Sequence, residues 1–445
     1  MAAINTITPK NILSLAIPAI IAGIAEPLIS LTDVAVIGNM DKNAVEGLLA
    51  VGLVGSFLSA IIWTLAQTKT SISSIVSNAL GSHQIDKINS LIPQVIWINI
   101  ALGLVIYAIT APLSSWIFTL YNAKGTALEF SISYYQVRAI GFPLTLSAFA
   151  IFGIFRGIQN TSWAMIASLS GAVVNVILDY LLVYGIPSYI PAYGVMGAAY
   201  ASLVAQVVML VIALFFLYKK TPFKPHLLTW NPHPKLKQHI ALTTNFFLRT
   251  AAINVAIFLS YRYASGYGEE YGATHAILMN IWLFFSFFID GFASAGNAIG
   301  GKLLGSKNAR GLLYLGKTTA IYGIIVAVML VIICGIFYQF IGHQFTESNL
   351  VFELFTSTFW VVLLMQPINA VAFVFDGIFK GWGEASYLRN LLFVLTAFVF
   401  IPTLLILDYF EFKLYAIWTA FGLWMLGRAA ILAYKFHLRI KTMEI

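Results

Sequence analysis

The chain has 445 residues, of which 60% are hydrophobic and only 9% are charged. Soluble domains have about 45–50% apolar and 25% charged residues, so this composition and a mean hydropathy of +0.87 exclude a soluble fold and predict a protein that crosses a membrane many times. The net charge of +8 does not indicate nucleic-acid binding, because the basic residues gather in loops on one side of the predicted spans.

Twelve apolar runs of about 20 residues or more follow one another along the chain, and runs of this length predict transmembrane helices. The predicted fold class is therefore an all-α polytopic membrane protein. The predicted spans cover residues 12–38, 50–79, 92–114, 130–155, 162–184, 195–218, 239–264, 273–300, 312–341, 351–379, 390–408 and 413–434.

The first span contains two acids, Glu26 and Asp33, unlike the uniform apolar core of a cleavable signal peptide, so we expect it to be retained. Glu26 precedes Pro27, and an acid beside a proline kink either satisfies freed backbone groups or lines a cleft. Cys334 is the only cysteine and lies within a span, which excludes a disulfide or a thiolate metal site within one chain.

The fifth span carries Asp179, and an ionised aspartate at the centre of a bilayer costs roughly 2.5–3.5 kcal/mol on insertion scales. Asp33 and Asp179 lie five and six residues before the outer ends of their spans, so both carboxylates are expected roughly 8–9 Å below those ends. Asn175 shares a helix face with Asp179, and Ser202 lies early in the sixth span. These four residues are predicted to form one polar pocket.

The longest polar connection, residues 218–239, separates two sets of six spans. The halves repeat two motifs at the same offset of 224 residues, "FGIFRGIQNTSW" with "DGIFKGWGEASY" and "ALGSHQIDK" with "LLGSKNARG". Because each half has an even number of spans, the two insert in the same orientation and are related by a pseudo-two-fold axis along the membrane normal. We expect a lobe at 1–218, a cytoplasmic linker at 219–238 and a lobe at 239–445.

Further charges lie within the spans. Arg249 and Asp290 are each 12 residues from a cytoplasmic lysine, hence about 18 Å deep, and a pair between them would compensate two buried charges. Lys69, at a similar depth, is a competing partner for Asp290. Asp376 stands four residues before Lys380, and an i,i+4 ion pair explains it without any role in function.

The chain resembles the multidrug and toxic compound extrusion (MATE) transporters, particularly their DinF-like branch, over nearly its whole length. The resemblance rests on the order and spacing of "PLISLTDVAVIGNM", "ALGSHQIDK", "FRGIQNT", "VVNVILDYLLVYGI", "GVMGAAYASLVAQ", "FFIDGFASAG" and "FVFDGIFKG". It implies a two-lobed exporter that exchanges organic solutes for protons or sodium ions, with an ion site at Asp33, Asn175, Asp179 and Ser202.

Two positions depart from the family pattern. Phe152 stands where some relatives have an asparagine, so an oxygen cage for sodium is incomplete. Asn297 stands where a glutamate is expected, which argues against a second proton site in the C-terminal half. Two desolvated carboxylates in one pocket titrate as a coupled pair, and we therefore favour protons over sodium.

The expected function is proton-coupled antiport of amphiphilic organic cations by alternating access, in a monomer with no cofactor and no metal. The positive-inside pattern places both termini in the cytoplasm, and the bacterial cytoplasmic (inner) membrane is the expected location. The alternatives are sodium coupling, or a lipid-linked oligosaccharide flippase of the same superfamily, for which a more cationic cavity is expected. A polytopic enzyme is disfavoured, because the sequence contains no nucleophile motif, phosphate loop or metal-ligand cluster.

Overall fold

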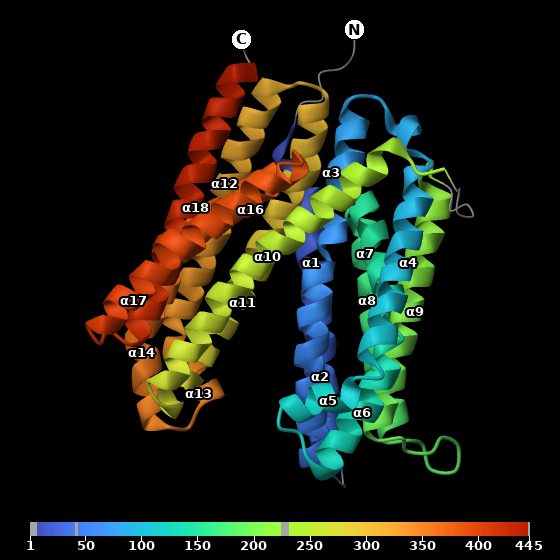
Figure 1. Cartoon of the computed structure of the whole chain (residues 1–445), viewed down its shortest axis with the longest axis vertical. Helices are drawn as coiled ribbons and strands as arrows, with labels where there is room; N and C mark the ends of the chain where they lie inside the picture. The colour runs from blue at the N-terminus through green and yellow to red at the C-terminus, as the bar shows by residue number, and fades with distance from the viewer. Residues whose placement is uncertain (1–6, 41–42, 224–230, 444–445) are drawn as a thin grey trace. The chain divides into compact units, whose positions relative to one another are not determined.

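The computed structural model describes residues 7–40, 43–223 and 231–443, except the side chains of residues 26–28, 30 and 31. These residues form helices and connecting loops, with one isolated β-bridge between Ile186 and Ile190 (Figure 1). The helices of the first half are α1 (Pro9–Gly38), α2 (Ala44–Leu65), α3 (Gln67–Gly81), η1 (Ile85–Ile88), α4 (Leu91–Thr110), α5 (Ser114–Leu120), α6 (Gly125–Ala139), α7 (Phe142–Gly157), α8 (Ser162–Val183) and α9 (Val195–Lys220). Those of the second half are α10 (Pro234–Gly266), α11 (Glu269–Gly305), α12 (Ala309–Ile336), α13 (Tyr338–Phe345), α14 (Asn349–Leu364), α15 (Gln366–Gly381), α16 (Ala385–Leu395), η2 (Thr396–Phe400), α17 (Ile401–Tyr409) and α18 (Leu414–Met443).

Within the described residues, nine helical segments are long and apolar enough to cross a membrane. The number rises to eleven when the bent pairs α6–α7 and α14–α15 are each taken as one span, and α1 adds the apolar stretch Pro9–Ala25. Each predicted span overlaps one of these helices. The prediction of an all-α polytopic membrane protein is confirmed.

The internal repeat predicted from the sequence is visible in the helix boundaries. Three helices of each half begin at matching residues: Ser114, Gly125 and Phe142 for α5 to α7, and Tyr338, Asn349 and Gln366 for α13 to α15. Each start in the second half lies 224 residues after its counterpart, as from 114 to 338. The two bent pairs also match, with bends of 45° and 44°.

A proline lies in the first turn of the second helix of each bent pair, Pro143 in α7 and Pro367 in α15. Proline has no backbone N–H to donate and its fixed φ suits the first helical turn, so it begins a new helix after a break. The bend therefore has the same local cause in both halves.

The repeated motif contains two glycines four residues apart, Gly153 and Gly157 in α7 and Gly377 and Gly381 in α15. A Cβ atom on Gly153 would lie 2.4 Å from the carbonyl oxygen of Lys69, and one on Gly377 would lie 2.2 Å from that of Ala293. Small residues at this spacing let two helix backbones approach closely. The motif thus packs α7 against α3 and α15 against α11.

Contacts between residues divide the chain into two compact units. The N-terminal unit contains Ile21–Val76 and Gln84–Ile240, and the C-terminal unit contains the described residues from Ala241 onward, Ser77–His83 and those before Ile21. The prediction of two lobes placed the residues before Ile21 and the segment Ser77–His83 in the N-terminal lobe. The end of α3 belongs there because it lies against α11, where a Cβ atom on Gly81 would meet the Lys302 carbonyl oxygen at 1.8 Å.

One helix pair dominates the packing of the N-terminal unit, since α8 runs along α9 (Figure 1). In the C-terminal unit α15 packs against α11, α12 and α18. Polar side chains on α15 are therefore enclosed by three other helices, and those on the facing sides of α8 and α9 lie against each other.

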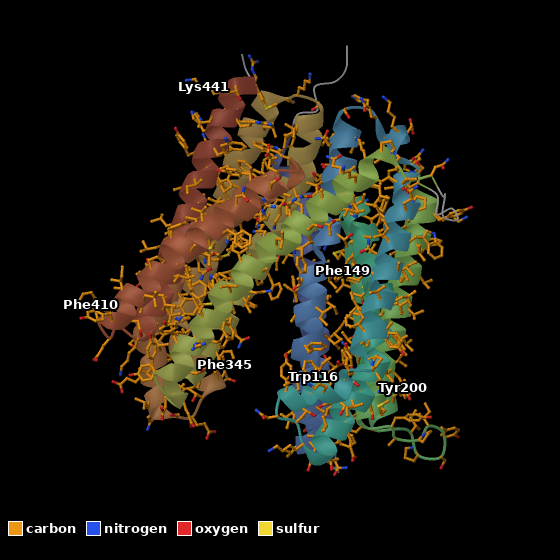
Figure 2. The ribbon with its side chains drawn as sticks, in the orientation of Figure 1. Trp116, Phe149, Tyr200, Phe345, Phe410 and Lys441 are labelled. Carbon is orange, nitrogen blue, oxygen red and sulfur yellow. The ribbon has the colours of Figure 1, made fainter. Side chains whose placement is uncertain are left out.

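Aromatic side chains are exposed on the short helices α5 and α13. Trp116 is 62% exposed and Phe345 is 51% exposed (Figure 2). Amphipathic aromatic rings favour the boundary between hydrocarbon and water, so these helices are suited to the membrane interface.

Candidate functional site

The four residues predicted for the coupling site lie together in the N-terminal unit, on α1, α8 and α9. Asn175 Nδ2 donates a hydrogen bond to Ser202 Oγ at 3.2 Å, and Ser202 Oγ donates one to Asp33 Oδ2 at 3.4 Å. Asp179 is close enough to Asp33 for the two carboxylates to interact electrostatically. All four side chains are almost fully buried.

A hydrogen bond joins the ends of α1 and α8, the helices that carry the two acids. Tyr184, the residue after α8, donates a hydrogen bond at 2.7 Å to the carbonyl oxygen of Val36 in α1. Gly185 follows with φ of +73°, a left-handed conformation that glycine adopts readily and that terminates helices. The chain turns back there, and α9 begins after a short loop.

Two residues of α6 that the sequence prediction missed also belong to the site. Tyr134 Oη donates a hydrogen bond to Asp33 Oδ2 at 3.2 Å, and Arg138 Nη1 lies 3.5 Å from the same oxygen. The Arg138 guanidinium also lies 5.7 Å from the centre of the Tyr134 ring. Arg138 is a charged residue inside the predicted span 130–155, and Tyr134 lies four residues earlier on the same helix face. A charge within an apolar span, with a tyrosine on the same face, could have revealed both residues from the sequence.

Several acceptor atoms of this acidic cluster accept no hydrogen bond from the described part of the chain. They are Oδ1 of Asp33, both carboxylate oxygens of Asp179 and the side-chain oxygen of Asn175. Buried polar atoms without partners are costly. The arrangement can therefore take up a proton, shared between the carboxylates, or a small cation.

A cavity of about 90 Å³ adjoins the cluster within the N-terminal unit. Its polar lining comes from Arg138, Thr145, Ser168, Ser202 and Gln206. Ligand pockets for drug-sized molecules enclose about 300–1,000 Å³, so this cavity has room for water or a small chemical group. Arg138 and Ser202 belong to both the cavity and the acidic cluster, and they connect the two.

Lys69 also lies in the N-terminal unit. Its ammonium group is 5.9 Å from the ring centres of both Phe149 and Phe152. Phe152 is buried. Glu26 lies in α1, and its side chain is outside the described part of the structure.

Charged residues of the C-terminal unit gather around Asp376 on α15. Arg249 Nη2 on α10 donates to both carboxylate oxygens at 2.7 Å, and Lys380 Nζ lies 2.9 Å from Oδ2. Arg428 Nη2 on α18 lies 3.6 Å from Oδ1. The expected i,i+4 pair of Asp376 and Lys380 is present, whereas Arg428, an isolated charge in the last predicted span, was missed.

The predicted pair of Arg249 and Asp290 is wrong. Arg249 binds Asp376, and the side chain of Asp290 on α11 is exposed. The prediction measured the depth of Arg249 from Lys237. Depth along α10 and α11 does not say which face of each helix a side chain occupies, and the acid that Arg249 meets lies on α15.

Comparisons with known proteins agree with the fold. A family model described as MatE matches residues 18–181 and 246–409, one segment in each half. Protein DETOXIFICATION 42 of Arabidopsis thaliana is 30% identical over 301 residues, which are 67% of this chain and 56% of that relative, so the chain spans little more than half of it. DNA damage-inducible protein F of Escherichia coli (strain K12) is 25% identical over 432 residues, 96% of this chain and 92% of that protein.

A solved structure of a multidrug resistance MATE family transporter of the MOP superfamily, in an outward-facing conformation, superposes with a TM-score of 0.87. It is 22% identical, and the match covers 98% of this chain and 96% of that one. At this identity the likeness shows the fold. The family model matches most of the chain, one segment in each half, and it shows that the chain belongs to the MATE family of transporters.

Proposed function

We propose that this protein exports amphiphilic organic cations from the cytoplasm of a bacterium in exchange for protons. The observation that carries the proposal is the buried pair of Asp33 and Asp179, whose free oxygens lack hydrogen-bond donors among the described residues. Two like charges in one enclosed site repel each other, and a bound proton removes the repulsion. Membership of a transporter family supports the same conclusion.

The charge of the site changes sign as protons bind. With Asp33 and Asp179 ionised and Arg138 cationic, the cluster has one net negative charge. One bound proton makes it neutral, and a second gives it one net positive charge. A cationic substrate is therefore attracted to the deprotonated site and repelled from the doubly protonated one, which is the electrostatic condition for exchange.

Arg138 also favours a proton over a sodium ion. A guanidinium 3.5 Å from Asp33 Oδ2 repels a metal ion placed between the two carboxylates, whereas a proton forms a short hydrogen bond between them. Phe152 supplies no oxygen ligand. Sodium coupling remains the alternative, because the free oxygens of Asp33, Asp179 and Asn175 are also ligands for hard cations.

Purified protein in liposomes loaded with a fluorescent organic cation tests the proposal. An imposed pH gradient should drive movement of the dye against its own gradient, and a sodium gradient at constant pH should not. Movement driven by sodium alone would transfer the coupling role to sodium. If neither gradient drives the dye, the proposal of cation-coupled export is wrong.

A further inference from the structure

The charged cluster of the C-terminal unit has more cationic than anionic groups. Arg249, Lys380 and Arg428 surround the single carboxylate of Asp376, and their side chains are only 5%, 16% and 2% exposed. Buried charges are tolerated when each is compensated. One carboxylate compensates one of these three cations, so two positive charges are in excess among the buried groups.

The two arginines also have donors left over. Nε of Arg249 and Nε of Arg428 make no hydrogen bond to the described part of the chain, and Nη2 of Arg428 has only its 3.6 Å ion pair with Asp376. Nη1 of Arg428 donates to the thioether of Met425, which is a weak acceptor. Guanidinium groups bind carboxylate and phosphate oxygens through paired N–H donors, so these free donors suit an oxyanion.

Among the residues that the structure describes, other groups of the unit do not remove the excess. Asp290 is exposed and acts on Lys380 only through longer-range attraction, and even with Asp290 counted the cluster has three cations and two anions. The guanidinium of Arg428 lies 5.1 Å from the centre of the Trp424 ring and 5.5 Å from that of Phe373. These rings hold it in place, but they add no negative charge.

Lys380 is the most exposed of the three cations. An anion that binds beside Lys380 would leave the close pair of Arg249 and Asp376 intact. The alternative explanation is that Lys380 has lost its proton, in which case one excess charge disappears and no anion is needed. The two explanations make opposite predictions for a variant that lacks the lysine.

We propose that this basic cluster binds an oxyanion, the carboxylate or phosphate group of a transported molecule. This inference rests on the proposed export function. It extends the substrate class of the exporter from simple organic cations to molecules that carry an anionic group. A more cationic cavity was the feature expected of a lipid-linked oligosaccharide flippase. A lipid phosphate is one possible source of the oxyanion, and a free organic acid is the other.

Oxyanion binding to the purified full-length protein in detergent tests the inference independently of transport. The thermal unfolding midpoint is measured against added sodium succinate, sodium phosphate and short-chain phosphatidate, with sodium chloride at equal ionic strength as the reference. At least one oxyanion should raise the midpoint more than chloride does, because a ligand that binds the folded state stabilises it. If no oxyanion exceeds chloride, the inference is wrong.

Lys380→Met removes one excess charge and keeps the pair of Arg249 and Asp376. It should raise the apparent dissociation constant for the oxyanion about tenfold or more, a change of the size expected for loss of one charged hydrogen-bond donor. Lys317→Met, at an exposed lysine of α12 outside the cluster, is the matched control and should bind as the wild type does. An unchanged response of Lys380→Met would overturn the inference, since it would show that the lysine carries no charge that an anion compensates.

The responses to the three oxyanions show whether the bound group belongs to a free organic acid or to a lipid. A response to succinate indicates a free organic acid, and a response to phosphatidate without one to succinate or inorganic phosphate indicates a lipid headgroup. Arg428→Met gives a second measurement, in which oxyanion binding should be lost while the close pair of Arg249 and Asp376 remains.

A transport experiment with two forms of one dye tests oxyanion recognition and export separately. A cationic xanthene dye is compared as its free carboxylic acid and as its methyl ester in liposomes under a pH gradient. Wild-type protein should prefer the free acid, and Lys380→Met should lose that preference. Oxyanion binding without export of either dye would refute the proposed function alone, and export of both dyes without oxyanion binding would refute the inference alone.

Discussion

Arg138 decides the charge of the acidic cluster in the N-terminal unit. Its guanidinium lies beside Asp33 and lines the adjoining cavity, so it partly compensates the two carboxylates before any ion binds. The positions of the acids within their spans identified them from the sequence, whereas the contact between Arg138 and Asp33 was visible only in the tertiary structure. The number and kind of ions that the site accepts follow from the whole cluster.

We expect Arg138→Met to make the site responsive to sodium. Removal of the guanidinium leaves two carboxylates uncompensated, which strengthens the attraction for a free cation. Sodium chloride, compared with choline chloride, should raise the unfolding midpoint of this variant and leave those of the wild type and Arg262→Met unchanged. Stabilisation of the wild type by sodium would instead favour sodium coupling, and absence of the effect in Arg138→Met would contradict the role given to the arginine.

Asp33→Asn and Asp179→Asn should each abolish export driven by a pH gradient while the protein still folds. Either change removes one of the two acids that share the proton, and the amide keeps the shape of the side chain. Dye export by purified variants in liposomes measures the effect, with Asp86→Asn in the exposed helix η1 as the control. Export at the wild-type rate by either variant would exclude that aspartate from coupling.

Asp376 should matter more for stability than any one of its partners. Asp376→Asn leaves three buried cations without a carboxylate, and an unpaired buried charge typically costs about 3–5 kcal/mol. Arg249→Met should cost less, because Lys380 and Arg428 still contact the carboxylate. Unfolding in denaturant compares the two variants, and an equal or larger loss in Arg249→Met would show that the other two cations do not compensate Asp376.

At the scale of elements, the repeated glycine pair connects sequence to packing. Gly153 and Gly377 occupy matching positions in the two halves, and each lies where the helix touches the backbone of a neighbouring helix. A backbone carbonyl cannot move aside as a flexible side chain can. The motif thus identifies the contact surfaces of α7 and α15, and it has a packing role that is independent of transport.

Gly377→Ala and Gly153→Ala should both lower the unfolding midpoint by several degrees, because the added methyl group separates two packed helices. Gly422→Ala in α18 is the matched control, since its Cβ atom would meet no other atom within 4 Å. An alanine there should be neutral or stabilising by up to about 1 kcal/mol, the difference in helix propensity. If the three variants unfold alike, close packing at the motif is not what requires glycine.

The predicted spans and the observed helices differ mainly where helices break. Hydropathy detects a run of apolar residues but not an interruption within it, so the breaks between α2 and α3, α6 and α7, and α14 and α15 were not predicted. The short helices α5 and α13 were also missed, because seven or eight residues are too few for a transmembrane signal.

At the scale of the whole molecule, the distribution of basic residues makes a prediction about orientation. In a Cys334→Ala background, cysteine at Arg310 should be protected from impermeant thiol reagents in intact cells, and cysteine at Glu269 should react. Both positions are exposed, and they are joined by α11, whose 37 residues are long enough to cross the membrane. The reverse labelling pattern would place the termini outside.

The sequence by itself determined the membrane class, the number of spans, the internal repeat and the four polar residues of the N-terminal cluster. These are local or periodic properties, since span length follows from bilayer thickness and a buried aspartate stands out against an apolar helix. Only the tertiary structure decided which charges meet. Arg138 joined Asp33, and Arg249 joined Asp376 instead of Asp290, because contacts between helices depend on their rotation, depth and packing, which no single helix specifies.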